Sequence, residues 1–251
     1  MYNPFSLENK TILVTGASSG IGRSIAIECS RMGAKVIITA RNEQRLRETL
    51  SLMTSGNHKI VVADLIDENS IVCMVNSLPM LNGIVHNAGV GNRALCKSLK
   101  GCDLDEVVKP NLYGPILLQR DILKKKKLAH GASVVMIASR APFAPSVGNA
   151  IYAASKGAIL GYAKVLALEC APQQIRVNSI CPAMVWTELI AKDASLMGTD
   201  YEELQKKYPL KRYGRPEDVS YLTVYLLSDA SSWMTGTSID LTGGGEGTLI
   251  L

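Results

Sequence analysis

The chain has 251 residues, of which 47% are hydrophobic and 20% are charged, and its net charge is +5. This composition is that of an ordinary globular protein, and so small a charge, mixed in sign, does not predict nucleic-acid binding. The first residues contain no basic region followed by an apolar stretch, and no run approaches the roughly 18 apolar residues of a membrane span. We therefore expect a cytoplasmic protein without a membrane partner.

The cysteines and histidines predict no metal site. The six cysteines contain no Cys-x-x-Cys pair, and the three histidines are scattered along the chain. Such spacing favours reduced thiols over a disulfide framework or a set of metal ligands.

Short β-branched apolar runs alternate with helical patterns along the chain. Strands are predicted at residues 11–14, 36–39, 60–62, 83–86, 133–137, 175–180 and 238–241, and helices at 21–32, 44–52, 71–77, 150–170 and 216–227. Strands this apolar, separated by helices, predict an α/β fold: a doubly wound, seven-stranded parallel sheet with helices on both faces. No linker or repeat interrupts the pattern, so we expect residues 1–251 to form a single domain.

A glycine-rich turn, Thr15-Gly-Ala-Ser-Ser-Gly-Ile-Gly22, joins the first predicted strand to the first helix. Its spacing is G-x-x-x-G-x-G rather than G-x-G-x-x-G. In this setting glycines allow the backbone to approach a pyrophosphate at a helix N-terminus, which predicts dinucleotide binding. The alternative is a tight turn with no ligand.

The end of the second strand predicts which cofactor binds. An acidic residue there would bind the ribose 2′-hydroxyl, but this chain has Ala40-Arg41-Asn42. Because an arginine can bind a phosphate with two hydrogen bonds, Arg41 favours NADP(H) over NAD(H). The alternative is a solvated arginine, with Glu43 near enough to neutralise it.

Tyr152 and Lys156 are spaced i, i+4 on a predicted helix, so they share one face. A free tyrosine has a pKa near ~10, and lowering it to ~7 takes about 4 kcal/mol. One ammonium at about 5 Å supplies roughly 3 kcal/mol at an effective dielectric constant of 20. The pair alone is a common chance spacing, but with Ser139 upstream and the glycine turn it predicts a carbonyl/alcohol oxidoreductase.

These motifs together resemble the short-chain dehydrogenase/reductase family in its single-domain, Rossmann-type form. Further matches are Asp64-Leu65 after the third strand, Asn87-Ala-Gly89 after the fourth, Asn111, and the segment Pro182–Thr187. They follow the family's order over nearly the whole chain.

The resemblance implies the role of each matching residue. Tyr152 would donate or accept the proton, Lys156 would bind the nicotinamide ribose and lower the tyrosine pKa, and Ser139 would orient the substrate carbonyl. Asn111 would help to hold a water in a proton relay behind Lys156. The cofactor-binding residues implied are Gly16, Ser18, Ser19, Gly20, Ile21, Gly22, Arg41, Asp64, Leu65, Asn87, Ala88, Gly89, Tyr152, Lys156, Pro182, Val185 and Thr187.

Three positions depart from the family pattern. Ala183 replaces a common glycine, Thr242 replaces a common aspartate, and His86 replaces a small polar residue before Asn87. We interpret His86 as a packed residue at the end of a strand. None of the three removes a predicted catalytic group.

Residues 184–212 are expected to form a substrate lid, because they follow the sixth strand at the carboxyl edge of the sheet. Their apolar side chains suit a hydrophobic ketone or acyl chain, although packing within the lid explains them equally well. These are Trp186, Leu189, Ile190, Leu196, Met197 and Tyr201.

Two basic features have two interpretations each. The run Lys124–Lys127 fits a solvated helix C-terminus. It also fits a docking site for an acidic acyl carrier protein, as a resemblance to 3-oxoacyl-carrier-protein reductases allows. Arg140 is either structural or a contact for an anionic substrate group.

The leading hypothesis is an NADPH-dependent reductase of a 3-oxoacyl or small-molecule ketone substrate. The alternatives are an NAD(P)-dependent hydroxysteroid, sugar or polyol dehydrogenase, or a non-catalytic nucleotide-binding regulator. The apolar helix after Tyr152 predicts a homodimer or homotetramer.

Overall fold

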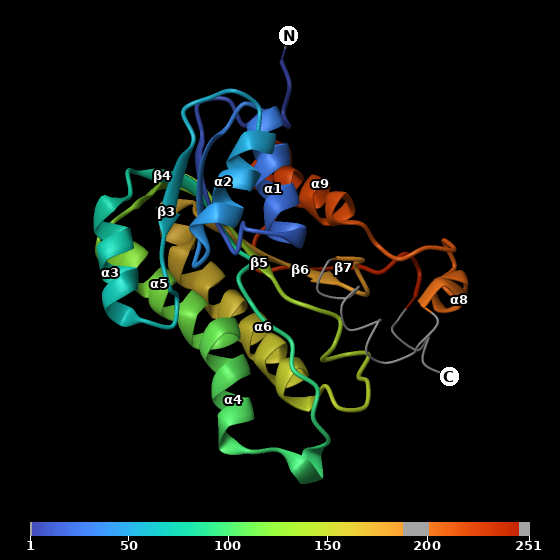
Figure 1. The fold of residues 1–251 in the computed structure, drawn as a ribbon. Coiled ribbons are helices and arrows are strands. Elements are labelled where there is room, and N and C mark those ends of the chain that lie inside the picture. The colour runs from blue at the N-terminus through green and yellow to red at the C-terminus, as the bar shows by residue number, and fades with distance from the viewer. Residues whose placement is uncertain (1, 188–200, 246–251) are drawn as a thin grey trace.

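Seven strands form one parallel sheet at the centre of the molecule (Figure 1). The computed structural model describes residues 2–187 and 201–245. The strand order is β3-β2-β1-β4-β5-β6-β7, and each neighbouring pair runs parallel. The strands are β1 Thr11–Thr15, β2 Lys35–Ala40, β3 Lys59–Val62, β4 Leu81–His86, β5 Leu128–Ile137, β6 Arg176–Pro182 and β7 Ser238–Leu241. The predicted seven-stranded, doubly wound α/β fold is confirmed.

Helices cover both faces of this sheet. On one face lie α1 (Gly20–Arg31), α2 (Glu43–Leu52) and α9 (Pro216–Leu227). On the other lie α3 (Glu68–Ser77), α5 (Gly114–Lys124) and α6 (Ala150–Cys170). The remaining helical elements are α4 Gly101–Val108, α8 Tyr201–Lys206, the π-helical turn η2 Lys109–Tyr113, and the short 3₁₀ turns η1 Cys96–Ser98, η3 Ala171–Gln173 and η4 Asp229–Ser231.

Alternation along each central strand builds the two halves of the core. On β4, Ile84 packs among α3, α5 and α6, whereas the next residue, Val85, packs toward α1 and α9. Both side chains are fully buried. Burying an aliphatic side chain of this size contributes about 1.5–3 kcal/mol, so the two-sided burial of the strands holds the layers together.

The sequence predicted every strand but no helix between residues 87 and 132. That region contains η1, α4, η2 and α5. Pro110 and Pro115 interrupt the helical pattern, which makes the segment look broken. In the structure α4, η2 and α5 follow one another without a break, and the two prolines lie in and directly after the wider turn η2, where the regular α-helical hydrogen-bond pattern is interrupted.

Among the described residues, one helical stretch is long and apolar enough to cross a membrane by those two criteria alone. It runs over Ala150–Gln173, which is α6 and the turn after it. The core helix of a soluble protein passes the same test. Because α6 buries Ile159, Ala163 and Leu166 against the sheet, we describe it as a core helix.

His86, at the end of β4, is buried as predicted. One ring nitrogen, Nε2, lies 2.9 Å from the side-chain oxygen of Gln119 on α5, and both residues are buried. Burial lowers the pKa of His86 from 6.5 to about 4, and the hydrogen bond to Gln119 opposes this shift only in part. The folded protein therefore holds His86 neutral.

This neutral histidine should make the protein less stable in acid. Between pH 6.5 and about 4 the unfolded chain protonates His86 while the folded chain does not, so stability rises with pH across this window and is complete above it. The shift corresponds to roughly 3 kcal/mol. We expect His86→Gln to show a smaller loss of unfolding free energy than the parent protein between pH 7 and 4.5 in urea titrations. The carboxylates titrate in both proteins, so identical slopes would contradict a buried neutral His86.

Candidate active site

The carboxyl ends of the central strands bring the predicted site residues to one edge of the sheet. Thr15 ends β1 before the glycine turn, and His86 ends β4 before Asn87. Ile137 ends β5 two residues before Ser139, and Pro182 ends β6. Ligands of open α/β sheets bind at this edge, so the topology itself gathers a site here.

The glycine turn is fastened to the loop after β4. The Thr15 hydroxyl accepts hydrogen bonds from the backbone N–H groups of Asn87 (3.0 Å) and Ala88 (3.1 Å). The Asn87 side-chain amide donates to the carbonyl oxygens of Thr15 (3.0 Å) and Gly16 (3.3 Å). Asn87 therefore acts on the cofactor turn by holding its backbone in place.

Glycine is required at each of the three predicted positions in the turn. Gly16 and Gly20 have φ of +65° and +52°, in the left-handed region that favours glycine. A Cβ on Gly16 would lie 2.8 Å from the Cα of Ala88, and one on Gly22 would lie 2.3 Å from the Gly16 carbonyl oxygen. The absence of side chains lets the turn pack tightly against itself and against the loop after β4.

The first turn of α1 suits a phosphate group. Ser19 is its N-cap, and the Ser19 side chain makes no capping hydrogen bond to the helix. Backbone N–H groups at such a helix start attract anions. Ile21 and Gly22 belong to this turn, and the Ser18 carbonyl accepts a hydrogen bond from Arg23 (2.7 Å). The residues present therefore fit the pyrophosphate of a dinucleotide.

Lys156 is buried beside Tyr152 with its ammonium group against the sheet. Its Nζ donates to the carbonyl oxygen of Ile137 at 2.8 Å and lies 5.8 Å from the centre of the Tyr152 ring. Only 5% of Lys156 is exposed, and burial lowers its pKa to about 8. A Cβ on Gly89 would lie 3.5 Å from this Nζ, so the loop after β4 passes directly over it.

The hydroxyl groups of Tyr152 and Ser139 are joined by a hydrogen bond. Burial raises the pKa of Tyr152, and the hydrogen bond with Ser139 only partly offsets this. The lowering of the tyrosine pKa by Lys156 stays a prediction. In this arrangement desolvation of the phenolate is the largest effect on the pKa of Tyr152, and the Lys156 ammonium is hydrogen-bonded to Ile137.

Asn111 connects the loop after β4 to α6. Its side-chain oxygen accepts from the Val90 N–H (2.7 Å), and its amide donates to the Val90 carbonyl (2.9 Å) and the Ser155 hydroxyl (3.1 Å). The Ser155 hydroxyl in turn donates to the carbonyl of Tyr152 (2.8 Å). The Asn111 amide thus uses both of its N–H groups within the protein and positions the helix that carries Tyr152 and Lys156.

The π-helical turn around Asn111 is a second feature of this junction. The turn η2 separates α4 from α5, and the Gly114 N–H bonds back to the carbonyl of Lys109, five residues earlier. Such wide turns occur mostly as single turns inside α-helices, often at functional sites. Here the turn brings Asn111 into the buried position beside Ser155.

Arg41 is exposed at the end of β2. Glu43, which we considered as a group that could neutralise it, forms an ion pair with Arg47 on the same helix. Asn42 caps α2 by accepting a hydrogen bond from the N–H of Arg45 (3.0 Å). Glu43 is therefore paired with Arg47, and not with Arg41 as the alternative interpretation required.

Asp64 and Leu65 follow β3 at the same edge. The Asp64 carboxylate accepts from the Ile66 N–H at 3.1 Å, and Leu65 is 9% exposed. A Cβ on Gly114 would lie 2.7 Å from the Leu65 carbonyl oxygen, so this loop packs against the start of α5.

The segment after β6 returns to the glycine turn. Val185 is buried and pairs with Gly214 in an isolated parallel bridge. A Cβ on Gly20 would lie 3.4 Å from a methyl group of Thr187. The structure therefore brings Pro182, Val185 and Thr187 to the edge where the sequence predicted them.

Arg140 braces the loop that carries Ser139. Its N–H donates to the Pro182 carbonyl (2.9 Å), and its guanidinium donates to the carboxylate of Asp240 (2.6 Å) and lies 4.9 Å from the ring centre of Phe143. These contacts tie β5, β6 and β7 together beside Ser139. They support the structural interpretation of Arg140 over contact with the substrate.

The structure describes only part of the segment predicted to form the lid, because residues 188–200 lie outside the described residues. Leu189, Ile190, Leu196 and Met197 fall there. Trp186 stacks on Tyr213 with ring centres 5.8 Å apart and an angle of 6° between the planes. Tyr208 contacts the same Tyr213 ring edge-on at 5.3 Å, so aromatic residues from both ends of the segment pack together.

The run Lys124–Lys127 lies at the amino edge of the sheet, opposite the site. The Lys127 carbonyl accepts a hydrogen bond from the N–H of Leu81, the first residue of β4, and the Lys127 ammonium caps the Leu78 carbonyl at the end of α3. The ten residues of β5 separate the run from Ser139. Because β5 bulges between Leu128 and Ser133, Leu128 and Met136 are separated by the length of Leu81–His86 on β4, about 17 Å at the rise of an extended strand. The run therefore does not face the Tyr152 of its own chain.

Several residues of this site were not predicted. Thr15, Ser155 and the carbonyl of Ile137 hold Asn87, Asn111 and Lys156 in place. Their contacts are long-range and have no fixed spacing, so only the fold reveals them. Among the described residues, no group of three or more His, Cys, Asp and Glu side chains is placed to hold a metal ion.

Comparison with known proteins decides the family. A family model described as enoyl-(acyl carrier protein) reductase matches residues 16–246. The 3-oxoacyl-[acyl-carrier-protein] reductase FabG of Rickettsia prowazekii is 34% identical over 238 residues, which cover 95% of this chain and 97% of that protein. The chain belongs to the short-chain dehydrogenase/reductase family.

Solved structures of short-chain dehydrogenases/reductases share the fold. Levodione reductase superposes with a TM-score of 0.88 at 27% identity, covering 95% of this chain and 98% of that one. A structure with bound NADP, described as a 2-deoxy-D-gluconate 3-dehydrogenase from Agrobacterium tumefaciens, has a TM-score of 0.86 at 29% identity and covers 97% and 98% of the two chains. Together with the family match, these relatives establish an oxidoreductase of CH–OH groups.

The packing of the glycine turn predicts the effect of one added methyl group. In Gly22→Ala the Cβ would lie 2.3 Å from backbone, so the turn and the start of α1 must move. We expect a loss of cofactor affinity of at least about 10-fold, measured by quenching of tryptophan fluorescence, because displaced N–H groups no longer meet the phosphates. Gly101→Ala, at the start of α4, is the control because its Cβ would meet nothing within 4 Å. Equal affinities in both variants would contradict this description of the turn.

Proposed function

We propose that the chain reduces a ketone to a secondary alcohol with NADPH, with Tyr152 as the proton donor. The observation that carries the proposal is the meeting of Ser139, Tyr152 and Lys156 at an edge whose glycine turn fits a dinucleotide. When bound, the nicotinamide supplies a hydride to the carbonyl carbon or accepts one from the alcohol.

Each residue of the site then has a chemical task. Ser139 donates a hydrogen bond to the carbonyl oxygen and stabilises the charge that develops there. Tyr152 transfers its phenolic proton to that oxygen, and its raised pKa keeps the proton in place at neutral pH. Lys156 has a pKa of about 8, so its ammonium is mostly charged at pH 7 and stabilises the phenolate left after proton transfer.

In this scheme Asn111 would act by holding the part of α6 that carries Tyr152 in place. Its side chain holds Ser155, and Ser155 holds the backbone of Tyr152. We infer that the predicted role in a proton relay falls to other atoms around Lys156, because the Asn111 amide donates two hydrogen bonds to the protein.

The substrate class is proposed from the relatives. The FabG protein of Rickettsia prowazekii is a 3-oxoacyl-[acyl-carrier-protein] reductase by name, so we propose a 3-oxoacyl thioester as substrate. A sugar or polyol dehydrogenase is the second candidate, because a gluconate dehydrogenase-like chain from Agrobacterium tumefaciens superposes with a TM-score of 0.89 at 25% identity. A carrier protein bound at Lys124–Lys127 would serve the site of a neighbouring copy, since the run lies at the far edge of its own chain.

We also propose that the protein forms a homodimer or homotetramer through α6. Val165 and Leu168 on this helix are 55% and 77% exposed, an unusual exposure for a pair of apolar side chains on a core helix. Light scattering coupled to size-exclusion chromatography measures the assembly directly.

The role of Tyr152 is tested by removing one oxygen atom. Tyr152→Phe keeps the ring and the packing but has no proton to give. We expect kcat for reduction of 3-oxobutyryl-N-acetylcysteamine to fall by about 10²–10⁴-fold, followed through NADPH absorbance, while NADPH affinity stays within twofold. Retained activity would remove Tyr152 from the mechanism.

The proposed preference for NADPH depends on Arg41. Replacing Arg41 by alanine should raise the KM for NADPH by about 10-fold and leave the KM for NADH nearly unchanged, because only NADPH has a 2′-phosphate to lose a charged hydrogen bond. Arg31→Ala is the control, since Arg31 lies at the far end of α1 and pairs with Glu28. If both variants change the two KM values in parallel, Arg41 does not select the cofactor.

A further inference from the structure

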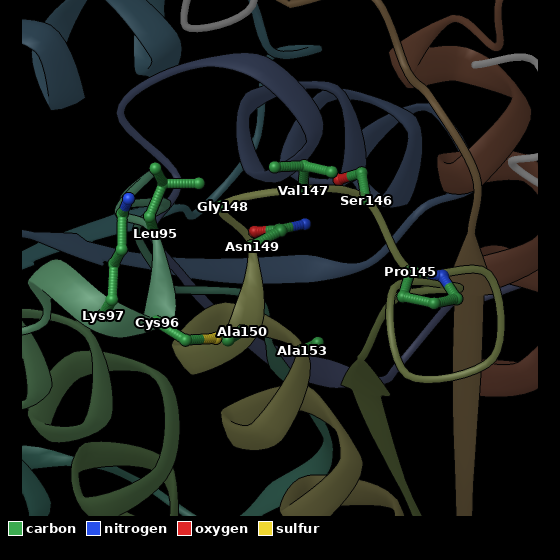
Figure 2. Close-up of a pocket in the computed structure, with 10 residues that line it drawn as sticks. All are labelled: Leu95, Cys96, Lys97, Pro145, Ser146, Val147, Gly148, Asn149, Ala150 and Ala153. Atoms are coloured by element: carbon green, nitrogen blue, oxygen red, sulfur yellow. The ribbon is translucent and has the colours of Figure 1, made fainter. Parts of the chain in front are cut away.

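A cavity of about 440 Å³ lies next to the first turn of α6 (Figure 2). Its walls come from the connection after β4, the connection after β5 and α6 itself. The lining residues are Leu95, Cys96, Lys97, Pro145, Ser146, Val147, Gly148, Asn149, Ala150 and Ala153. We call it the Lys97 cavity. None of its lining residues belongs to the site described above.

The two connections that form the Lys97 cavity are fastened to each other. The Ala94 N–H donates to the Gly148 carbonyl at 2.9 Å. Gly148 has φ of +79°, a conformation that favours glycine. This hydrogen bond therefore fixes the two loops relative to each other where they line the cavity.

Asn149 connects the cavity to the proposed proton donor. It is the N-cap of α6, and Tyr152 and Lys156 follow it at i+3 and i+7 on the same helix face. In Figure 2 the Asn149 side chain lies in the middle of the lining residues. Ala150 and Ala153, in the same helical turn as Tyr152, form part of the wall, whereas Tyr152 itself does not line the cavity. The space therefore begins within one helical turn of the proposed proton donor.

Most of the lining is apolar, and the polar side chains in it are those of Lys97, Ser146 and Asn149. Leu95, Pro145 and Val147 provide apolar walls, and the two alanines leave room between them. Such a surface suits a hydrocarbon segment, because polar groups placed there would lose hydrogen bonds to water. Lys97 stands beside Leu95 at one side of the cavity in Figure 2.

The loop that contributes Lys97 carries only positive charge. Residues 87–102 include Arg93, Lys97 and Lys100 and no aspartate or glutamate. The first acidic residue after them is Asp103, and its carboxylate accepts a hydrogen bond from the backbone N–H of Lys100 at 2.8 Å. A concave site with cations of one sign attracts anions.

We propose that the Lys97 cavity holds the apolar segment of a substrate that also carries an anionic group, and that Lys97 binds this group. The proposal rests on the proposed function, since it places the reacting carbonyl at Tyr152. The anionic group is either a phosphate of a pantetheine-type arm or a carboxylate on the acyl chain. Lys97 is thereby a specificity-determining residue.

Binding of unreactive thioesters tests this without relying on turnover. The three probes are butyryl coenzyme A, the neutral butyryl-N-acetylcysteamine, and glutaryl-N-acetylcysteamine, whose chain ends in a carboxylate. Dissociation constants are measured by calorimetry with NADP⁺ at saturation, so that coenzyme A cannot occupy the adenosine site. Reductase activity is assayed separately, so a failure of the proposed function is seen independently.

For Lys97→Gln we expect the dissociation constant of at least one anionic probe to rise by about 3- to 10-fold relative to that of the neutral probe. Whether coenzyme A or the glutaryl thioester responds identifies the phosphate or the carboxylate. Lys124→Gln, at the opposite edge of the sheet, is the matched control and should change none of the three ratios. Unchanged ratios in Lys97→Gln, or an equal loss for all three probes, would overturn the proposal.

The apolar part of the cavity is tested with a second variant. Ala153→Leu fills space in the wall, so it should weaken binding of hexanoyl-N-acetylcysteamine more than that of the acetyl thioester. An equal effect on both chain lengths would show that the acyl chain lies elsewhere.

Discussion

The buried ammonium group of Lys156 is the constraint around which this site is organised. A charge removed from water is costly unless it finds partners, and here the partner is the carbonyl oxygen of Ile137 at the end of β5. The contact fixes α6 against the central strand and sets the height at which Tyr152 meets Ser139. Its cost appears as the lowered pKa of Lys156, about 8. A fold that needed only stability would gain by replacing this lysine with an apolar residue.

The surrounding contacts hold that lysine and its neighbours from two sides. Asn111 and Ser155 bind the first turns of α6 to the loop after β4, and Arg140 binds the loop after β5 to β7 through Asp240. Thr15 and Asn87 do the same for the glycine turn. Because all these loops leave the carboxyl ends of adjacent parallel strands, the sheet supplies a rigid base for a site made of connections. The Lys97 cavity is built from two of the same connections and from the first turn of α6.

The sequence predicted the parts of this structure that have local signals. Periodicity located all seven strands, and glycine spacing located the turn whose backbone has no room for a side chain at Gly22. It did not predict α4 and α5, because Pro110 and Pro115 look like interruptions until the π-helical turn beside them is known. It also gave no sign that burial raises the pKa of Tyr152, since the burial of a phenol depends on every element packed around it. Ser155 and Asp240, the hydrogen-bond partners of Asn111 and Arg140, are far from them in the sequence, so no local pattern predicts these contacts.

The central claim is that this edge of the sheet delivers a hydride and a proton to one carbonyl, with Lys156 and Tyr152 acting together. The most direct test is a single-turnover reaction of 3-oxobutyryl-N-acetylcysteamine with NADPH that carries deuterium at both C4 positions, with the product analysed by mass spectrometry. The account predicts an alcohol with one deuterium at the carbinol carbon, formed at least about 100-fold more slowly by a Lys156→Met variant saturated with cofactor. A product without deuterium, or an unchanged rate in the variant, would contradict it.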